Sequence, residues 1–157
     1  MELTSSAFQQ ARSIPIKYTC DGANVSPGFA WKGAPAQTKS FALIMHDPDA
    51  PRAGGFTHWV LYNIPASVTE LPPNLPQEEQ IAGCGVQGKN DAGKIGYFGP
   101  CPPAGTHRYV VRLYALETEL HLTPGASHQE VQKAMRGHIL GQSELTGTYA
   151  RTSHKAA

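Results

Sequence analysis

The stretch Arg108–Leu116, which reads RYVVRLYAL, decides the fold class. It is as long as a β-strand and too short for a convincing helix. In an extended chain alternate residues share a face, and one face here carries Tyr109, Val111, Leu113 and Ala115. The opposite face is also mostly apolar, so the segment is predicted to be a central strand covered on both sides.

Other strand-length runs of apolar residues occur along the chain, and turn signals separate them. Ser40–His46 (SFALIMH) and Thr57–Ile64 (THWVLYNI) are the clearest. Weaker strand candidates are Ile14–Tyr18, Phe29–Trp31, Ile81–Gln87 and Glu144–Ala150. Many short strands separated by Gly and Pro turns are typical of an antiparallel β-sandwich.

One late segment predicts a helix. Ser127 and Glu130 form a capping box, and apolar residues follow at helical spacing. The helix is expected over Ser127–His138, with Gly141 as its C-terminal stop. The predicted fold is therefore mostly β, an antiparallel β-sandwich with a C-terminal α-helix, as one domain over residues 1–157.

Composition excludes several classes of protein. The 157 residues carry a net charge of +1, without the basic stripe of nucleic-acid binders. No apolar run approaches the roughly 18 residues of a membrane span, and the start lacks the pattern of a signal peptide, so a cytoplasmic location is expected. Cys20, Cys84 and Cys101 are odd in number and form no CxxC motif, so all three are predicted to be free thiols.

Two polar segments adjoin the clearest strands. DPDAP (residues 47–51) is stiffened by two prolines, and Pro51 or Pro48 is a candidate for a cis bond. Asp47 either caps its own loop in an Asx-turn or serves a site. Likewise, His58 beside Trp59 is either a satisfied core residue or a ligand-binding one.

A third polar segment is more specific. Residues 97–109 read YFGPCPPAGTHRY, in which three prolines rigidify the loop. Gly99 permits close approach to the backbone. His107 and Tyr109 are two residues apart and so share one face of a strand.

Together these blocks resemble the phosphatidylethanolamine-binding protein family, in its bacterial branch of Raf kinase inhibitor-like proteins. DPDAP, HW and the YxGPxPPxGxHRY stretch occur in the family's order, preceded by NVSP (24–27) with Trp31. NDAGKIGY (90–97) resembles the family's lead into its Pro-rich loop. Phe56 departs from the Trp that bacterial members often carry, which would alter the rim of the site.

The resemblance implies a β-sandwich with a small anion-accepting pocket at one end. The expected ligand-binding residues are Asp47, Pro51, His58, Trp59, Gly99, Pro100, His107 and Tyr109. Asp47 would orient an imidazole, while His58, the Gly99 N–H and the Tyr109 hydroxyl would donate to the ligand. Binding would then depend on pH near 6–7, the usual histidine range, and His154 in the tail would serve as a control.

The expected partners are a small anionic or phosphorylated ligand, a phospholipid headgroup at a membrane surface, and a kinase or protease inhibited by binding. The resemblance also implies a homodimer, and no cofactor is expected. Because His46, His58 and His107 show no ligand spacing, no metal is expected either. The alternative function is a small hydrolase of an ester or phosphoester, with Cys101 and His107 as candidate nucleophile and base.

Overall fold

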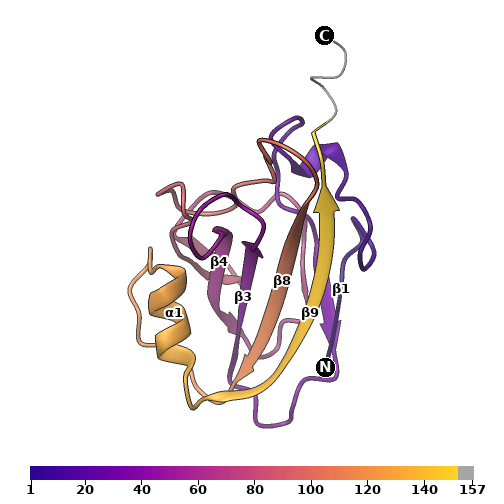
Figure 1. Ribbon diagram of the computed structural model, residues 1–157. Helices are drawn as coiled ribbons and strands as arrows, with labels where there is room; N and C mark the ends of the chain where they lie inside the picture. The colour runs from indigo at the N-terminus through magenta and orange to yellow at the C-terminus, as the bar shows by residue number, and fades with distance from the viewer. Residues whose placement is uncertain (152–157) are drawn as a thin grey trace.

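The computed structural model describes residues 1–151 and contains two antiparallel sheets packed face to face (Figure 1). The larger sheet has six strands in the order β6-β7-β4-β3-β8-β9, and the smaller has three in the order β1-β2-β5. The larger comprises β3 (Ser40–Asp47), β4 (Phe56–Pro65), β6 (Gln80–Ile81), β7 (Gly85–Gln87), β8 (His107–Leu116) and β9 (Ile139–Tyr149). The smaller comprises β1 (Glu2–Thr4), β2 (Phe29–Lys32) and β5 (Glu70–Leu71). The predicted fold class is confirmed.

The six-stranded sheet is covered on both faces, as the two apolar faces of β8 predicted. Its inner face packs against the smaller sheet, where Tyr109, Val111 and Leu113 join one buried cluster. Its outer face packs on the helix α1 (His128–Met135), whose Val131 and Met135 are buried in a second cluster. Figure 1 shows α1 beside β3 and β4. The six-stranded sheet is therefore the central layer of the molecule.

The helix begins where the sequence predicted and ends earlier. Ser127 accepts from the Glu130 N–H, while the Glu130 carboxylate accepts from the Ser127 N–H, which completes the capping box. The last helical residue is Met135, and the predicted end at His138 is wrong. Gly137, at φ +81°, supplies the left-handed residue that stops the helix, and Gly141 lies inside β9.

One predicted strand is absent. Residues 16–18 of the expected strand Ile14–Tyr18 form a 3-10 helix, η1, and only Ser13 bridges to Thr148. Pro15 has no N–H for a ladder, and its carbonyl instead accepts from the Tyr18 N–H at 3.0 Å. The expected strand Ile81–Gln87 is likewise divided, into the hairpin β6–β7.

The cysteine prediction is wrong for two of the three residues. Cys20 and Cys101 form a disulfide, whereas Cys84 is free. An odd number of cysteines does not exclude one disulfide, and here the fold brings together two cysteines that are 81 residues apart in the sequence. Because disulfides persist mainly in oxidising compartments, the bond does not support the cytoplasmic location expected from the sequence.

The described residues settle two further expectations. No cis peptide bond occurs in residues 1–151, so Pro48 and Pro51 are both trans. In the same range no helix is long and apolar enough to cross a membrane, which takes about 20 residues. His154, the expected control, lies outside the described residues.

Candidate functional site

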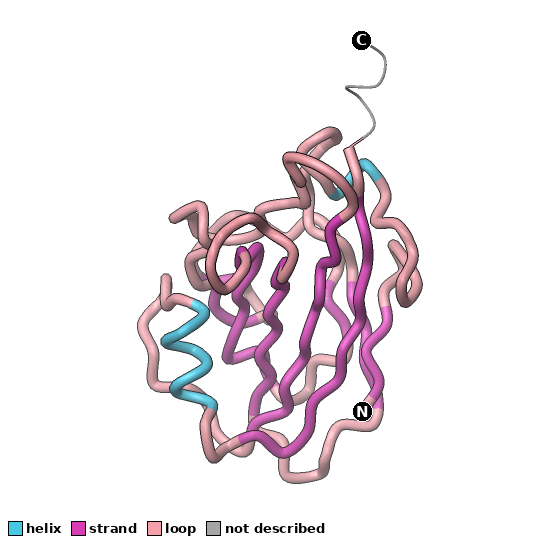
Figure 2. The backbone as a smooth tube through the Cα atoms, in the orientation of Figure 1, coloured by secondary structure: helices cyan, strands magenta, loops and turns pink. Residues whose placement is uncertain are grey.

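Loops gather at one end of the molecule, beyond the end of β3 and the starts of β4 and β8 (Figure 2). They enclose a cavity of about 280 Å³. Five of the eight predicted site residues line it, namely Asp47, Pro51, His58, His107 and Tyr109. Strand ends provide the rigid positions, and the proline-rich loops provide the rim.

Asp47 is the last residue of β3, and its carboxylate both caps its own loop and contacts a histidine of the cavity. Its Oδ1 accepts from the Asp49 N–H at 2.7 Å, which caps the DPDAP loop. Its Oδ2 accepts from His107 Nδ1–H at 2.6 Å, and both side chains are buried. This bond fixes the orientation and tautomer of the His107 ring.

The DPDAP loop is also clamped to β8 from outside. The Asp49 carboxylate accepts from Arg108 Nε at 2.9 Å, from Arg108 Nη2 at 2.8 Å and from the Arg108 N–H at 2.9 Å. These bonds lower the pKa of Asp49 to about 2. Asp49 therefore remains ionised and holds the loop over the cavity.

A β-bulge in β4 sets the direction of His58. Met45 pairs with Trp59 and His46 pairs with Thr57, so His58 is an extra residue with no partner on β3. As a result, Trp59 and His58 both lie on the inner side of the sheet. The His58 ring lies 5.2 Å from that of Tyr109, whereas Thr57 reaches the α1 side, where its hydroxyl contacts His128.

His58 is neutral in the folded protein. Burial is the main cause that lowers its pKa, to about 4, although the Phe98 carbonyl and the charge of Asp47 oppose it. The ring contacts Phe98 O through Nδ1 at 2.5 Å. Nδ1 therefore carries the proton, and Nε2 is an acceptor. At neutral pH His58 therefore offers a ligand an acceptor at Nε2, where the sequence analysis expected a donor.

This burial predicts a pH-dependent stability. Below about pH 6.5 the unfolded chain protonates His58, whereas the folded protein does so only near pH 4. Stability from this residue is complete above about pH 6.5 and is lost as the pH falls toward 4. We expect about 2–3 kcal/mol less free energy of unfolding at pH 4.5 than at pH 7 from His58 alone.

Urea denaturation at the two pH values measures this loss. The His58→Asn variant, which keeps a donor toward Phe98 O, should show a smaller pH dependence than the wild type by that amount. His121→Gln, at an exposed position, is the control and should keep the wild-type dependence. Equal pH dependence in the wild type and His58→Asn would contradict the neutral burial of His58.

Tyr109 lines the cavity and has an unpaired hydroxyl. Its oxygen is buried and has no hydrogen-bond partner within residues 1–151. Burial raises the pKa of this phenol well above its usual value, and the charge of Asp47 acts in the same direction. The group therefore remains a neutral donor at every physiological pH. A buried donor without a partner costs about 1–3 kcal/mol, which a ligand could recover.

The other three predicted residues lie elsewhere. The Gly99 N–H donates to Asn24 Oδ1 at 3.0 Å and so is not directed at a ligand. The Pro100 carbonyl accepts from the Cys20 N–H at 3.1 Å. Trp59 is fully buried between the sheets, where its Nε1–H donates to Gln87 Oε1 at 2.7 Å. None of these three lines the cavity.

Gly99 does permit a close approach, as predicted, but to the protein itself. A Cβ at this position would lie 2.2 Å from Asn24 Oδ1 and 2.6 Å from Tyr18 O. The Tyr97 hydroxyl also donates to Tyr18 O at 2.7 Å, and the disulfide adds a covalent link. The Pro-rich loop is thus fixed on the η1 segment, which positions its rim over the cavity.

Phe98 and Arg52, which the sequence analysis missed, complete the wall together with Phe56, which it placed at the rim. Phe98 and Phe56 line the cavity with their rings 5.6 Å apart, and the Arg52 guanidinium lies 5.5 Å from the centre of the Phe56 ring. Pro102 and Pro103 close the opposite rim. The sequence could have indicated the lining residues through their positions next to the DPDAP, HW and GP motifs. The cavity thus has a polar floor and a largely apolar wall.

Metal coordination was tested over the same residues. Within the described residues 1–151, no group of three or more His, Cys, Asp and Glu side chains could hold a metal ion. The two rings of the cavity are already oriented by a carboxylate and a carbonyl. The arrangement is suited to hydrogen bonding with a ligand.

Sequence comparisons agree with this architecture. The phosphatidylethanolamine-binding protein profile matches residues 4–150. A UPF0098 protein of Methanothermobacter thermautotrophicus is 52% identical over 151 residues, which cover 96% of this chain and 99% of the relative. A UPF0098 protein of Aquifex aeolicus is 48% identical over 154 residues, which cover 96% and 89%.

Solved structures show the same similarity. The crystal structure of a phosphatidylethanolamine-binding protein homologue from Chlamydia trachomatis has a TM-score of 0.88 at 41% identity, covering 96% of this chain and 97% of the other. YbcL of Escherichia coli, described as a member of the mammalian family, has a TM-score of 0.89 at 34% identity, covering 96% and 98%. With this sequence match across almost its whole length, the chain belongs to the phosphatidylethanolamine-binding protein family.

Proposed function

We propose that this protein binds a small oxyanion, such as phosphate or a phosphate monoester, that carries an apolar substituent. The observation that carries the proposal is the buried hydroxyl of Tyr109, a residue that lines the cavity; this hydroxyl has no partner among the described residues. It lies on the same floor as two imidazoles whose orientation is already fixed.

The floor can recognise an oxyanion that still carries a proton. Tyr109 would donate to one ligand oxygen, while the Nε2 lone pair of neutral His58 would accept the ligand's own O–H. This pairing explains how an anion can bind near the Asp47 carboxylate, whose Oδ2 is occupied by His107. Arg52 at the rim supplies a positive charge.

The apolar wall of the cavity would select the organic group to which the oxyanion is attached. Phe56, Phe98 and the rim prolines offer an apolar surface around the polar floor. Binding pockets commonly combine an apolar wall with a few convergent polar groups. An organic phosphate or carboxylate fits this division better than a bare ion. A phosphorylated side chain of a kinase or protease target, or a phospholipid headgroup, would present the same chemistry.

Binding is favoured over the hydrolase alternative by the state of Cys101. This residue lines the cavity, but its sulfur is bonded to Cys20 and is unavailable as a nucleophile. His107, the candidate base, already donates through Nδ1 to Asp47. We therefore propose a regulatory protein that acts by holding a ligand.

The test is a phosphate titration of the Tyr109→Phe variant, followed by the NMR shifts of His58 and His107. Phenyl phosphate, which adds an apolar group, is titrated in parallel and should bind more tightly than phosphate. Loss of a hydrogen bond to a charged group should weaken binding by roughly 10- to 150-fold. Because the hydroxyl has no protein partner among the described residues, the variant should be at least as stable as the wild type.

Tyr114→Phe is the matched control, since Tyr114 lies on the same strand but in the cluster beneath α1. It should leave phosphate affinity unchanged. Equal affinity in Tyr109→Phe and the wild type, or His58 and His107 signals that do not respond to either ligand, would reject the proposal.

A further inference from the structure

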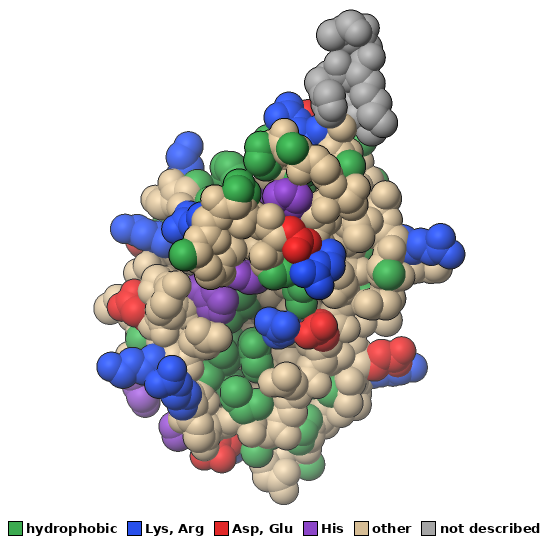
Figure 3. Space-filling model, viewed as in Figure 1, with side chains coloured by type: hydrophobic (Ala, Val, Ile, Leu, Met, Phe, Trp, Pro, Cys, Tyr) green, Lys and Arg blue, Asp and Glu red, His purple; other side chains and the backbone are tan. Residues whose placement is uncertain are grey.

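A second cavity, of about 310 Å³, lies on the α1 side of the six-stranded sheet. Its side chains come from β3, β4, β8, α1 and two loops, and none is aromatic except for two histidines. Figure 3 shows histidine side chains gathered in a hollow on this face. We propose that this cavity is a second binding site, which takes a small oxyanion of the sulfate or phosphate class between His46 and His128.

The two histidines share one hydroxyl. His46 Nδ1 lies 3.0 Å from Thr57 Oγ1, and His128 Nδ1 lies 2.8 Å from the same oxygen. Thr57 has one hydroxyl proton, so with both rings neutral it donates to one Nδ1 and accepts from the other. Their ring centres are 5.4 Å apart, so Thr57 holds the rings as a pair.

Both Nε2 atoms remain for a ligand. Every hydrogen bond of these two rings within residues 1–151 runs through Nδ1. His46 Nε2 is directed at Gly55, which lines the cavity and where a Cβ would lie 2.7 Å from this nitrogen. A side chain at Gly55 would therefore displace the His46 ring, so glycine is required beside this nitrogen.

The surrounding charges favour an anion. Arg52 and Arg112 line the cavity, and Glu144 of β9 accepts from Arg112 Nε at 2.9 Å, which offsets part of its charge. Asp91 is the one acidic residue of the lining, and its Oδ2 accepts from the Thr57 N–H at 2.8 Å. If Glu144 is counted, two arginines stand against two carboxylates. Protonation of either ring then makes the cationic side chains more numerous than the acidic ones.

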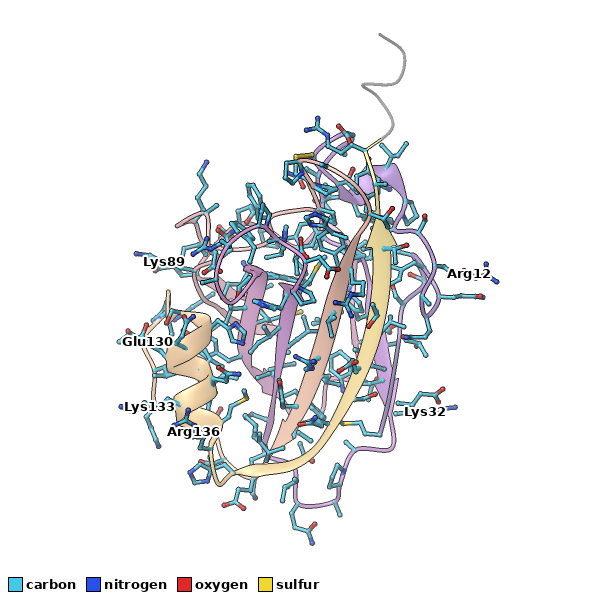
Figure 4. The ribbon with its side chains drawn as sticks, viewed as in Figure 1. Arg12, Lys32, Lys89, Glu130, Lys133 and Arg136 are labelled. Atoms are coloured by element: carbon cyan, nitrogen blue, oxygen red, sulfur yellow. A yellow bond between two sulfur atoms is a disulfide. The ribbon has the colours of Figure 1, made fainter. Side chains whose placement is uncertain are left out.

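The helix contributes three polar side chains from its first turns. From α1 the lining receives His128, Gln129 and Gln132, whose amide groups can donate to an oxyanion. The labelled Lys133 points away from the molecule in Figure 4 and takes no part. The site thus rests on side chains converging from several elements. Within residues 1–151 no group of three or more His, Cys, Asp and Glu side chains could hold a metal ion.

Affinity should increase as the pH falls. Burial, with the charges of His46 and Arg112, lowers the pKa of His128, while Asp91 acts in the opposite direction. The His128 ring is therefore largely neutral near pH 7 when the site is empty. An anion stabilises the charged ring, so binding takes up a proton. Sulfate keeps a constant charge across this pH range. A change in its affinity with pH therefore reflects titration of the protein and not of the ligand.

The experiment is a sulfate titration of the full chain at about pH 5.5 and about pH 7.5, followed by histidine NMR. The His46 and His128 signals report the second site, and those of His58 and His107 report the first. We expect saturable shifts of His46 and His128 with affinity about 10-fold higher at the lower pH. His128→Gln should weaken the site, read at His46, by at least about 10-fold.

His138→Gln is the control, because His138 follows the same helix and contacts Glu117 instead. It should bind sulfate as the wild type does. Unresponsive His46 and His128 signals, or sulfate affinity at His46 that is equal in His128→Gln and the wild type, would overturn the second site. Because each cavity has its own reporters, this failure is distinguishable from that of the first site.

Discussion

Replacing Trp59 with alanine is expected to lower the free energy of unfolding by about 3–5 kcal/mol and to leave the phosphate affinity of the folded protein unchanged. Trp59 is fully buried, with its ring 5.4 Å from Tyr97 and 6.3 Å from Phe29. Truncation opens a cavity between the sheets. It also leaves the buried Gln87 Oε1 without its donor.

Urea denaturation gives the stability, and phosphate titration gives the affinity. Trp59→Phe should lose less stability, because it keeps much of the apolar volume. Phe56→Ala is the contrasting control, since Phe56 lines the cavity and is only partly buried. It should weaken ligand binding more than folding. A Trp59→Ala protein with wild-type stability and weakened phosphate binding would contradict this expectation and would place Trp59 in the binding site.

Removal of the disulfide is the second large effect. The Cys20→Ala/Cys101→Ala double variant should lose about 2–4 kcal/mol of unfolding free energy, since the bond closes a loop with a sequence separation of 81 residues. Figure 4 shows the bond among the loops at the end of the molecule. Cys101 lines the cavity, so phosphate affinity should also decrease as the rim becomes mobile.

Denaturation of the wild type with and without a reducing agent, beside the double variant, measures this effect. The reduced wild type and the double variant should have similar stability. Cys84→Ala, which removes the free thiol, should remain sensitive to the reducing agent. Stability of the oxidised wild type equal to that of the double variant would show that the bond does not constrain the fold.

The strands could be predicted because their signals are local. Residues 108–116 show two apolar faces, and the structure buries both. Ser127 and Glu130 mark the start of the helix, because the side chain of each accepts a hydrogen bond from the backbone N–H of the other within one turn. By contrast, β1 and β5 have three and two residues and depend on pairing with β2, so no local pattern marks them.

Adjacent residues of the HW motif show where local reasoning stops. Simple alternation places His58 and Trp59 on opposite faces of a strand. The bulge in β4 instead places both on the inner side, and it directs Thr57 toward His46 and His128. A bulge depends on the register with β3, which is set by packing along the whole strand. The second cavity depends on the same shift.

The sequence by itself determined the sandwich, the helix start and the residue types of the first cavity, because periodicity, capping and short motifs act over a few residues. Only the tertiary structure decided that Cys20 meets Cys101, that the Gly99 N–H binds Asn24, and that His58 is neutral. Each of these depends on contacts between distant segments. Burial in particular comes from residues on several elements, and it is burial that turns His58 from a donor into an acceptor.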